Sequence, residues 1–193
     1  MERIVHDNGI VLLRSDRGAT RLAFTERTGG VSKTPYASLN LGSHVGDELE
    51  SVIENRRLVL EALGCADDMQ RLLVPNQVHG DDVVVVRSSD AADLAGIRSR
   101  ISKGADAIVC TAAHVPVMLC FADCVPVLLS CEHNAFAVVH SGWRGTYARI
   151  AAKTARILCE ETGCSPFDIT AYIGPHIQGD EYEVSTDLMR TFS

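Results

Sequence analysis

Short apolar runs, each closed by polar residues, dominate the middle of this 193-residue chain. Three of them occupy residues 115–120, 125–130 and 135–139, and the first two are near duplicates. Runs this short, unbroken and partly β-branched are typical of buried strands. We therefore expect the core of the protein to be built around a β-sheet.

Other segments extend this pattern. Strands are predicted over residues 10–14, 20–24, 83–86, 107–110, 115–119, 125–129, 135–139 and 169–173, with a turn at residues 15–18 between the first two. Helices are predicted over about residues 48–63 and 146–162 from apolar residues at helical spacing. Gly64 and Gly163 provide the stops, and Asp47 with Glu50 forms a capping-box pattern at the first start.

Strands and helices follow one another without a linker, a solenoid repeat or a low-complexity segment. This order favours an α+β (α/β layered) fold. With 46% hydrophobic residues, a chain of this length can bury one substantial core, so a single domain over residues 1–193 is expected.

The charge balance excludes some classes of partner. The net charge is −7, and no basic run interrupts it, which argues against a nucleic acid or an acidic membrane as partner. The first residues lack the long apolar region of a signal peptide, and no apolar window is long enough to cross a bilayer. A cytoplasmic location is expected.

The seven cysteines are an odd number without paired spacing, unlike a disulfide framework. Cys110, Cys120, Cys131 and Cys159 lie in or beside apolar segments, where a thiol behaves as a small hydrophobic group. Cys124 differs, because Asp123 beside it marks a polar break between two apolar runs.

Three polar clusters border the predicted strands, at residues 76–80, 122–124 and 140–145. They contain His79, Cys124 and His140. Two imidazoles and one thiolate suit zinc (Zn²⁺) in a catalytic site, where three protein ligands leave the fourth tetrahedral position open. Taken alone, a histidine in such a place is more often a hydrogen-bonded residue at the end of a strand than a metal ligand.

Several motifs are similar to those of a known family. They lie at residues 25–32 (TERTGGVS), 38–42 (SLNLG), 44–47 (HVGD), 55–56 (NR), 173–175 (IGP) and 182–184 (YEV), together with the three polar clusters. In this order they resemble the YfiH family, which is also described as laccase-domain or polyphenol oxidase proteins, purine nucleoside phosphorylases and peptidoglycan editing factors.

The resemblance implies mixed β-sheets flanked by helices in a YfiH-like fold. It also implies that His79, Cys124 and His140 are the metal-binding and catalytic residues of a zinc enzyme. That enzyme would act on purine nucleosides by phosphorolysis of adenosine, inosine, guanosine or methylthioadenosine, and by deamination of adenosine.

Two departures from the family pattern stand out. Ser141 replaces the alanine that usually follows the second histidine, a change between two small residues. Family members are also expected to continue beyond the position of Ser193, through a segment ending in a Ser-x-Arg-Arg strand that would border the site.

Both reactions need particular groups. A zinc-activated water could attack C6 of adenine, as in nucleobase deaminases. Phosphorolysis instead requires phosphate to be held against the ribose, for which Arg27, Arg56 and Arg144 are candidate donors. Asn40 and Gln77 are candidates for binding hydroxyls or base edges. Trp143 could stack on a purine or simply anchor the core.

Three alternatives remain from the sequence. Cys124 could be a nucleophile activated by a histidine, in a metal-free hydrolase or amidase acting on peptidoglycan precursors. The site could hold copper (Cu²⁺) in a polyphenol oxidase, although the seven histidines include no His-x-His pair. The chain could also be a non-catalytic fragment that binds metal.

Overall fold

A mixed five-stranded sheet forms the centre of the protein. In this computed structural model, which describes residues 1–192, the strand order is β4 (Val83–Val86), β5 (Ala107–Cys110), β7 (Phe136–Ser141), β6 (Val125–Ser130) and β8 (Thr170–Ile173). β4 and β5 are parallel, and the other pairs are antiparallel. The strands predicted for these five segments are confirmed, with ends shifted by at most two residues.

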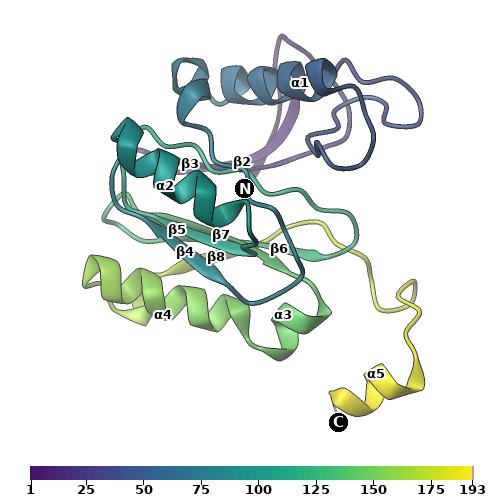
Figure 1. Ribbon diagram of the computed structural model, residues 1–193, viewed down its shortest axis with the longest axis vertical. Coiled ribbons are helices and arrows are strands. Elements are labelled where there is room, and N and C mark those ends of the chain that lie inside the picture. Colours follow the sequence, from purple (N-terminus) through teal and green to yellow (C-terminus); the bar gives the residue numbers. More distant parts are fainter. Residues whose placement is uncertain (193) are drawn as a thin grey trace.

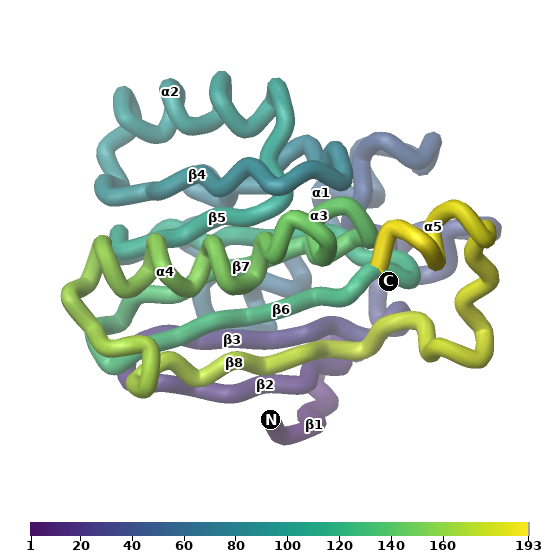
Figure 2. The backbone as a smooth tube through the Cα atoms, turned by 90° about the horizontal axis from the view of Figure 1, so that it is seen from below, coloured from purple at the N-terminus to yellow at the C-terminus, as the bar shows by residue number. Residues whose placement is uncertain are grey.

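Both faces of this sheet are covered, which explains why its strands are almost uniformly apolar. On one face, Val127 and Val139 pack with Leu158 of α4 (Ile150–Thr162). On the other, Val84 packs with α2 (Ala91–Ile101). Figure 1 shows α4 and α2 on opposite sides of the strands. Figure 2 shows the strands in order from β4 to β8, with α4 in front of β7.

A second sheet is antiparallel and lies against the first. It contains β1 (Glu2–Val5), β2 (Val11–Arg17) and β3 (Thr20–Thr25), in that order. Side chains of β3 contact the five-stranded sheet, while Leu12 of β2 packs with Val59 of α1 (Leu49–Ala62). The layers therefore run from α1 through the two sheets to α4, and the predicted α+β class with sheets flanked by helices is confirmed.

Shorter elements connect these layers. They are η1 (Ala66–Arg71), α3 (Trp143–Tyr147), η2 (Pro166–Asp168) and α5 (Thr186–Thr191). After β8 the chain leaves the sheet, and α5 lies apart from both sheets in Figure 1. No helix within residues 1–192 is long and apolar enough to cross a membrane.

The strand predicted over residues 115–119 is wrong. This run makes only an isolated bridge, in which the Leu73 N–H donates to the Pro116 carbonyl and the Met118 N–H donates to the Leu73 carbonyl. Pro116 has no N–H to offer a second neighbour. The run is apolar because it passes between layers, so that Val115, Met118 and Leu119 each join a different hydrophobic cluster.

The helix predicted over residues 146–162 is two helices. Arg149 adopts a left-handed conformation (φ 56°) between α3 and α4 and ends the regular hydrogen bonding. The break turns Ile150 and Leu158 of α4 towards the sheet, and both are fully buried. Tyr147, expected on the buried stripe, is instead 59% exposed.

The other differences lie at element ends and in weakly patterned segments. The expected capping box is absent, because Asp47 accepts bonds from Ser32 and Asn40 instead of capping Glu50. β2 continues to Arg17, so the turn falls later than residues 15–18. β1 and α2 were not predicted; β1 is largely exposed, and α2 has only two fully buried side chains, Leu94 and Ile101.

A buried amide links α1 to the loop that precedes it. Asn55 is fully buried, and its Nδ2 donates to Ser32 Oγ at 2.8 Å and to the Asn40 carbonyl at 2.8 Å. Its Oδ1 accepts the Val31 N–H at 2.8 Å. The loop of residues 30–40 thus takes its shape from one helical side chain.

We expect Asn55→Ala to lower the free energy of unfolding by about 3 kcal/mol, because it leaves several buried polar groups without a partner. Urea denaturation followed by circular dichroism measures this loss. Glu54→Ala, on the same helix, removes an exposed ion pair with Arg57 and should cost less than about 1 kcal/mol. Equal losses in the two variants would contradict a special role for Asn55.

Candidate metal centre

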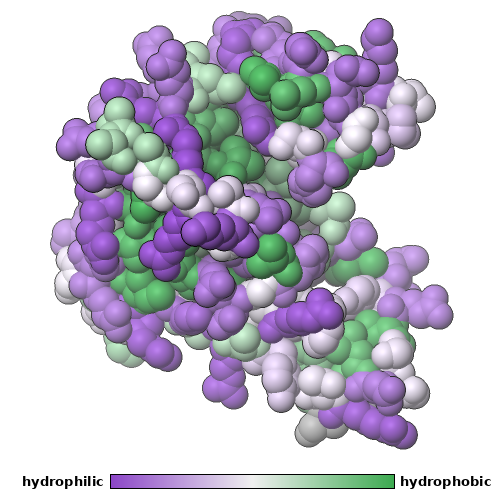
Figure 3. All heavy atoms as spheres, in the orientation of Figure 1, coloured by the Kyte–Doolittle hydropathy of each residue, from purple (hydrophilic) through white to green (hydrophobic). Residues whose placement is uncertain are grey.

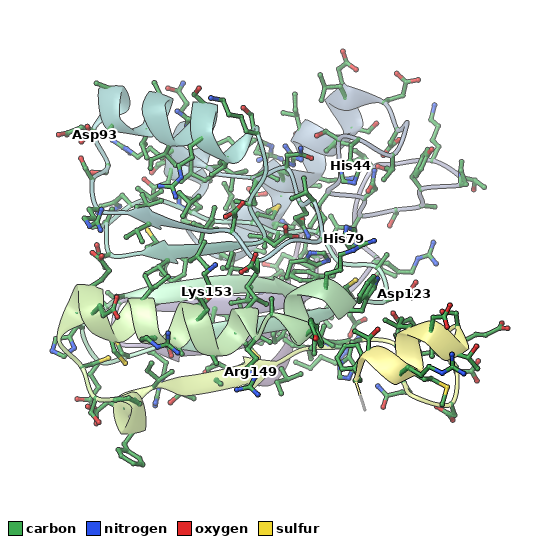
Figure 4. The ribbon with its side chains drawn as sticks, turned by 60° about the horizontal axis from the view of Figure 1, so that its bottom comes forward. His44, His79, Asp93, Asp123, Arg149 and Lys153 are labelled. Carbon is green, nitrogen blue, oxygen red and sulfur yellow. The ribbon has the colours of Figure 1, made fainter. Side chains whose placement is uncertain are left out.

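Three segments converge at one end of the five-stranded sheet. His140 is the last residue but one of β7, and Cys124 directly precedes β6, which pairs with β7 so that Pro126 lies opposite His140. His79 lies in the loop before β4. The candidate ligand atoms of these three residues lie within 4.8 Å of one another. Figure 4 shows His79 and Asp123 at the same end of the sheet.

Burial increases from His79 to His140. His79 is exposed, Cys124 is partly buried, and His140 is only 3% exposed. The two imidazole rings meet edge to face, with centroids 4.7 Å apart and planes at 80°. The trio therefore forms a cluster with one side fixed in the protein and one side open to solvent.

The carboxylate of Asp106 holds this cluster together. Asp106 is fully buried and directly precedes β5. Its Oδ1 lies 2.7 Å from His140 Nδ1 and accepts the His79 N–H at 3.0 Å. Its Oδ2 accepts the N–H groups of Gly80 at 2.8 Å and Val78 at 3.2 Å.

These bonds favour the ionised form of Asp106. Burial opposes ionisation of Asp106, but the hydrogen bonds from His140, Gly80 and Val78 outweigh it and hold the pKa of Asp106 below its usual range. An ionised Asp106 accepts a hydrogen bond from the Nδ1–H group of His140. In this tautomer Nε2 carries the lone pair that a metal ligand requires.

The thiol of Cys124 has a different electrostatic setting. Burial raises its pKa, and the negative charges of Asp123 and Asp106 raise it further. In the absence of a cation, Cys124 is therefore held as a neutral thiol. A bound metal ion would reverse this preference, since thiolates are the ligating form.

The backbone around the trio is tightly constrained. His79 and Asp123 both have positive φ, at 58° and 73°, a conformation that non-glycine residues adopt only where surrounding contacts enforce it. Gly142 faces all three side chains. A Cβ there would lie 3.1 Å from His79 Cδ2 and 3.4 Å from Cys124 Sγ. The absence of a side chain at position 142 therefore leaves room for the side chains of the trio.

His79 and His140 line a cleft of about 960 Å³ between the two sheets. Phe24 of β3 and Val138 of β7 lie on its walls. A volume of this size is at the upper end of what small-molecule sites occupy. On the face drawn in Figure 3, the surface is hollowed between the layer that contains α1 and the arm that ends in α5.

The cleft also receives three of the residues expected to bind substrate, Arg27, Asn40 and Gln77. Arg27 binds the Ala37 carbonyl through Nε and Nη2. Asn40 bonds to both backbone groups of Gly42. Gln77 forms two bonds with the backbone of Cys120, at 2.7 and 2.8 Å. In this structure the side chains of all three residues form hydrogen bonds with backbone groups.

The remaining two arginines lie off the cleft wall. Arg56 is partly buried, with Nε and Nη2 on the Leu41 carbonyl, and burial lowers its pKa. Arg144 is exposed on α3, with its guanidinium carbon 4.4 Å from the centre of the Trp143 ring. The structure does not bring Arg144 to the cleft, and one face of Trp143 is already covered.

Sequence reasoning missed Asp106 and Gly142. Asp106 lies in an ordinary-looking Gly-Ala-Asp-Ala stretch before a predicted strand. The one signal in the sequence is its position, because a charged residue directly beside a fully apolar run is unusual for a buried strand. Gly142 was noted only as a flanking glycine, and its contact with all three side chains depends on the tertiary fold.

The donor set fits a zinc ion. His79 and His140 offer nitrogens and Cys124 offers a sulfur, which together match a three-ligand catalytic zinc site with one open position. The hydrogen bond from His140 to a carboxylate is the supporting contact commonly found behind metal-bound histidines. Copper(II) also accepts nitrogen and sulfur ligands.

Several proteins of known sequence are similar to this chain and share one name. A protein of Corynebacterium glutamicum named purine nucleoside phosphorylase is 37% identical over 171 residues, which are 88% of this chain and 66% of that protein. A protein of Deinococcus radiodurans with the same name is 38% identical over 95% of this chain and 67% of its own length. Bacillus subtilis YlmD, also so named, is 35% identical over 86% of this chain and 59% of its own. The chain therefore spans about two thirds or less of the length of these relatives.

Solved structures show the same fold. The hypothetical protein YfiH of Bacillus licheniformis matches with a TM-score of 0.83 and 30% identity, over 98% of this chain and 70% of that one. YlmD of Geobacillus stearothermophilus matches with a TM-score of 0.74 and 31% identity, over 95% and 64%. Residues 21–193 match the family described as multi-copper polyphenol oxidoreductase laccase. The chain belongs to this laccase-like family, whose relatives include YfiH and YlmD.

Proposed function

We propose that this protein is a metal-dependent purine nucleoside phosphorylase whose centre is formed by His79, Cys124 and His140. The observation that carries the proposal is the convergence of these three ligand atoms beside a cleft that His79 and His140 line and whose volume can hold a nucleoside. Relatives named purine nucleoside phosphorylase support the reaction class. The substrates would be a purine nucleoside and inorganic phosphate.

Zinc is the metal we propose, held by His79, Cys124 and His140. When bound, zinc would supply a Lewis acid that polarises a substrate oxygen or lowers the pKa of a water. Asp106 would keep the proton of His140 on Nδ1 and the ring in a fixed orientation. His79, the exposed member of the trio, lies where a substrate can reach it.

The cleft walls would orient the nucleoside. Phe121 and Pro175 provide apolar lining, and the ring centroid of Phe121 lies 5.6 Å from that of His140. Arg27 makes no described bond through Nη1, so this group is our candidate for binding phosphate. Bringing phosphate and the nucleoside together costs translational and rotational entropy, which is a large part of the barrier to such a transfer. A site that holds the two in contact removes this cost from the chemical step.

The same electrostatics disfavour a metal-free cysteine nucleophile. The pKa of Cys124 is raised by burial and by two carboxylates, whereas nucleophilic cysteines lie in surroundings that lower the pKa. A ligand role has no such conflict, because the cation itself stabilises the thiolate. We therefore place hydrolysis of peptidoglycan precursors second.

For the proposed centre, the first prediction concerns turnover. We expect the wild-type chain, loaded with zinc, to release free base from inosine or adenosine only when phosphate is present, and Cys124→Ala to reduce this rate by about 100-fold. Chromatography of base and ribose 1-phosphate measures both. Cys159→Ser, a partly buried cysteine on α4, serves as the matched control and should keep the wild-type rate.

Three outcomes would contradict this proposal. Release without phosphate would indicate a hydrolase, and conversion of adenosine to inosine alone would indicate a deaminase. An unchanged rate in Cys124→Ala would remove the trio from the reaction.

The second prediction concerns Asp106. In Asp106→Asn one side-chain oxygen becomes an NH₂ group, which cannot accept, so two of the four bonds are lost whichever way the amide turns. We expect zinc affinity to fall by about 10–100-fold. Competition with a chromophoric chelator measures this affinity. Asp82→Asn, at an exposed neighbouring carboxylate, should bind zinc as tightly as the wild type, and equal weakening of both variants would overturn the assigned role.

The third prediction concerns the space at Gly142. Its φ of −70° suits alanine, so Gly142→Ala should fold normally. The new Cβ would press on the His79 ring at 3.1 Å, and we expect zinc affinity to fall by at least about threefold as the ring is displaced. Gly96→Ala on α2, which meets no atom within 4 Å, is the matched control. Wild-type affinity in Gly142→Ala would show that His79 does not need this space.

A further inference from the structure

A second group of cysteines lies at the far end of the five-stranded sheet. Cys159 is in the last turn of α4, and Cys164 is the second residue after that helix ends. The two sulfurs are 3.8 Å apart, with the Cys164 thiol oriented as a donor to Cys159 Sγ. Cys131, which follows β6, belongs to the same hydrophobic cluster.

This group is well separated from the candidate metal centre. Cys124 directly precedes β6 and Cys131 directly follows it, so the six residues of the strand lie between them. A strand of this length spans about 20 Å. Chemistry at Cys159 and Cys164 can therefore be observed independently of the metal centre.

The end of α4 fixes the distance between the two thiols. Gly163 has a φ of 72°, and its N–H donates to the Cys159 carbonyl at 2.7 Å. A left-handed residue at this position turns the chain back, so that the residue after it packs on the last helical turn. The Cys164 N–H also donates to Thr162 Oγ1, at 3.3 Å.

The chain after Cys164 is held as well. Ser165 and Asp168 form a reciprocal capping box at the start of η2, with bonds of 3.0 Å from the Ser165 N–H and 3.3 Å to Ser165 Oγ. Cys164 therefore lies between two hydrogen-bonded turns. The conformational entropy of bringing the sulfurs together has largely been lost on folding.

We propose that Cys159 and Cys164 are a redox-active dithiol, which closes to an intrachain disulfide by exchange with a low-molecular-weight disulfide such as oxidised glutathione. Cys159 is the more exposed of the two and reacts first. Burial and the hydrogen bond with Cys164 raise the pKa of the Cys159 thiol, so its thiolate forms at mildly alkaline pH. This thiolate attacks one sulfur of the reagent, breaks the S–S bond and releases one glutathione thiolate. The Cys164 thiolate then attacks Cys159 Sγ in the mixed disulfide and releases the second glutathione. Two protein thiols are oxidised and one reagent disulfide is reduced to two thiols.

The geometry favours this pairing over the alternative within the cluster. A disulfide requires an S–S distance of about 2.05 Å, and the two sulfurs, at 3.8 Å, are already close to it. The Cys131 thiol points instead to the Ala135 carbonyl, at 3.9 Å, within its own turn. Cys159 and Cys164 are therefore the pair that closes first.

The test is peptide mapping after oxidation. The purified full chain, with metal chelated, is incubated with oxidised glutathione at mildly alkaline pH, alkylated and digested with trypsin. Residues 157–190 contain no Lys or Arg before Arg190, so Cys159 and Cys164 fall in one peptide, whereas Cys110, Cys120, Cys124 and Cys131 fall together in residues 104–144. Cleavage after Glu161 separates Cys159 from Cys164.

We expect peptide 157–190 to form a disulfide at least about tenfold faster than peptide 104–144. The disulfide is detected as a loss of two hydrogens and as resistance to alkylation. Its two halves should stay joined after cleavage at Glu161 until a reductant is added. Cys159→Ser and Cys164→Ser should each retain glutathione on the remaining cysteine, and Cys131→Ser should behave as wild type. Full alkylation of Cys159 and Cys164 under these conditions, or a cross-link from either to peptide 104–144, would overturn the proposal.

Discussion

The buried carboxylate of Asp106 is the group on which the candidate centre depends. A charge in the protein interior is costly unless it is paired and hydrogen-bonded, and Asp106 receives four donors, from the His140 ring and from three consecutive N–H groups of residues 78–80. One side chain thus positions a loop and a strand that are far apart in sequence. The Asp106 carbonyl adds a bond from the His140 N–H, at 2.7 Å. Two of the three candidate ligands are consequently positioned by the same residue.

The layers of the fold explain why the centre lies beside a cleft. The five-stranded sheet is covered by α4 on one face, while the other face is shared between α2 and the N-terminal sheet. The two sheets meet where β3 packs against β6 and β7 and where Ser15 of β2 bonds to Tyr172 of β8. The space beside the first contact is lined from both sides. One wall of this cleft therefore comes from residues 19–27 and 39–45, and the loop between these two segments is held by the buried amide of Asn55.

The sequence predicted those parts of the structure that depend on local patterns. Strongly apolar strands such as β6, and the long amphipathic helix α1, follow from periodicity alone. The run at residues 115–119 misled the prediction, because burial between three clusters leaves the same apolar composition as burial in a sheet. The trio could be named from its residue types and from family resemblance. Asp106 could not, because its importance arises from four contacts made across 26 to 34 residues of sequence.

The cysteines show how surroundings rather than residue type assign chemistry. Cys124 has two imidazoles nearby and two carboxylates that oppose its ionisation, so a cation is the partner that suits it. At the other end of β6, Cys159 has another sulfur as its neighbour, held there by the helix cap at Gly163. A thiol whose nearest reactive group is a second thiol favours disulfide chemistry, and one among imidazoles favours metal binding. Because a rigid strand separates the two settings, each can react without altering the other.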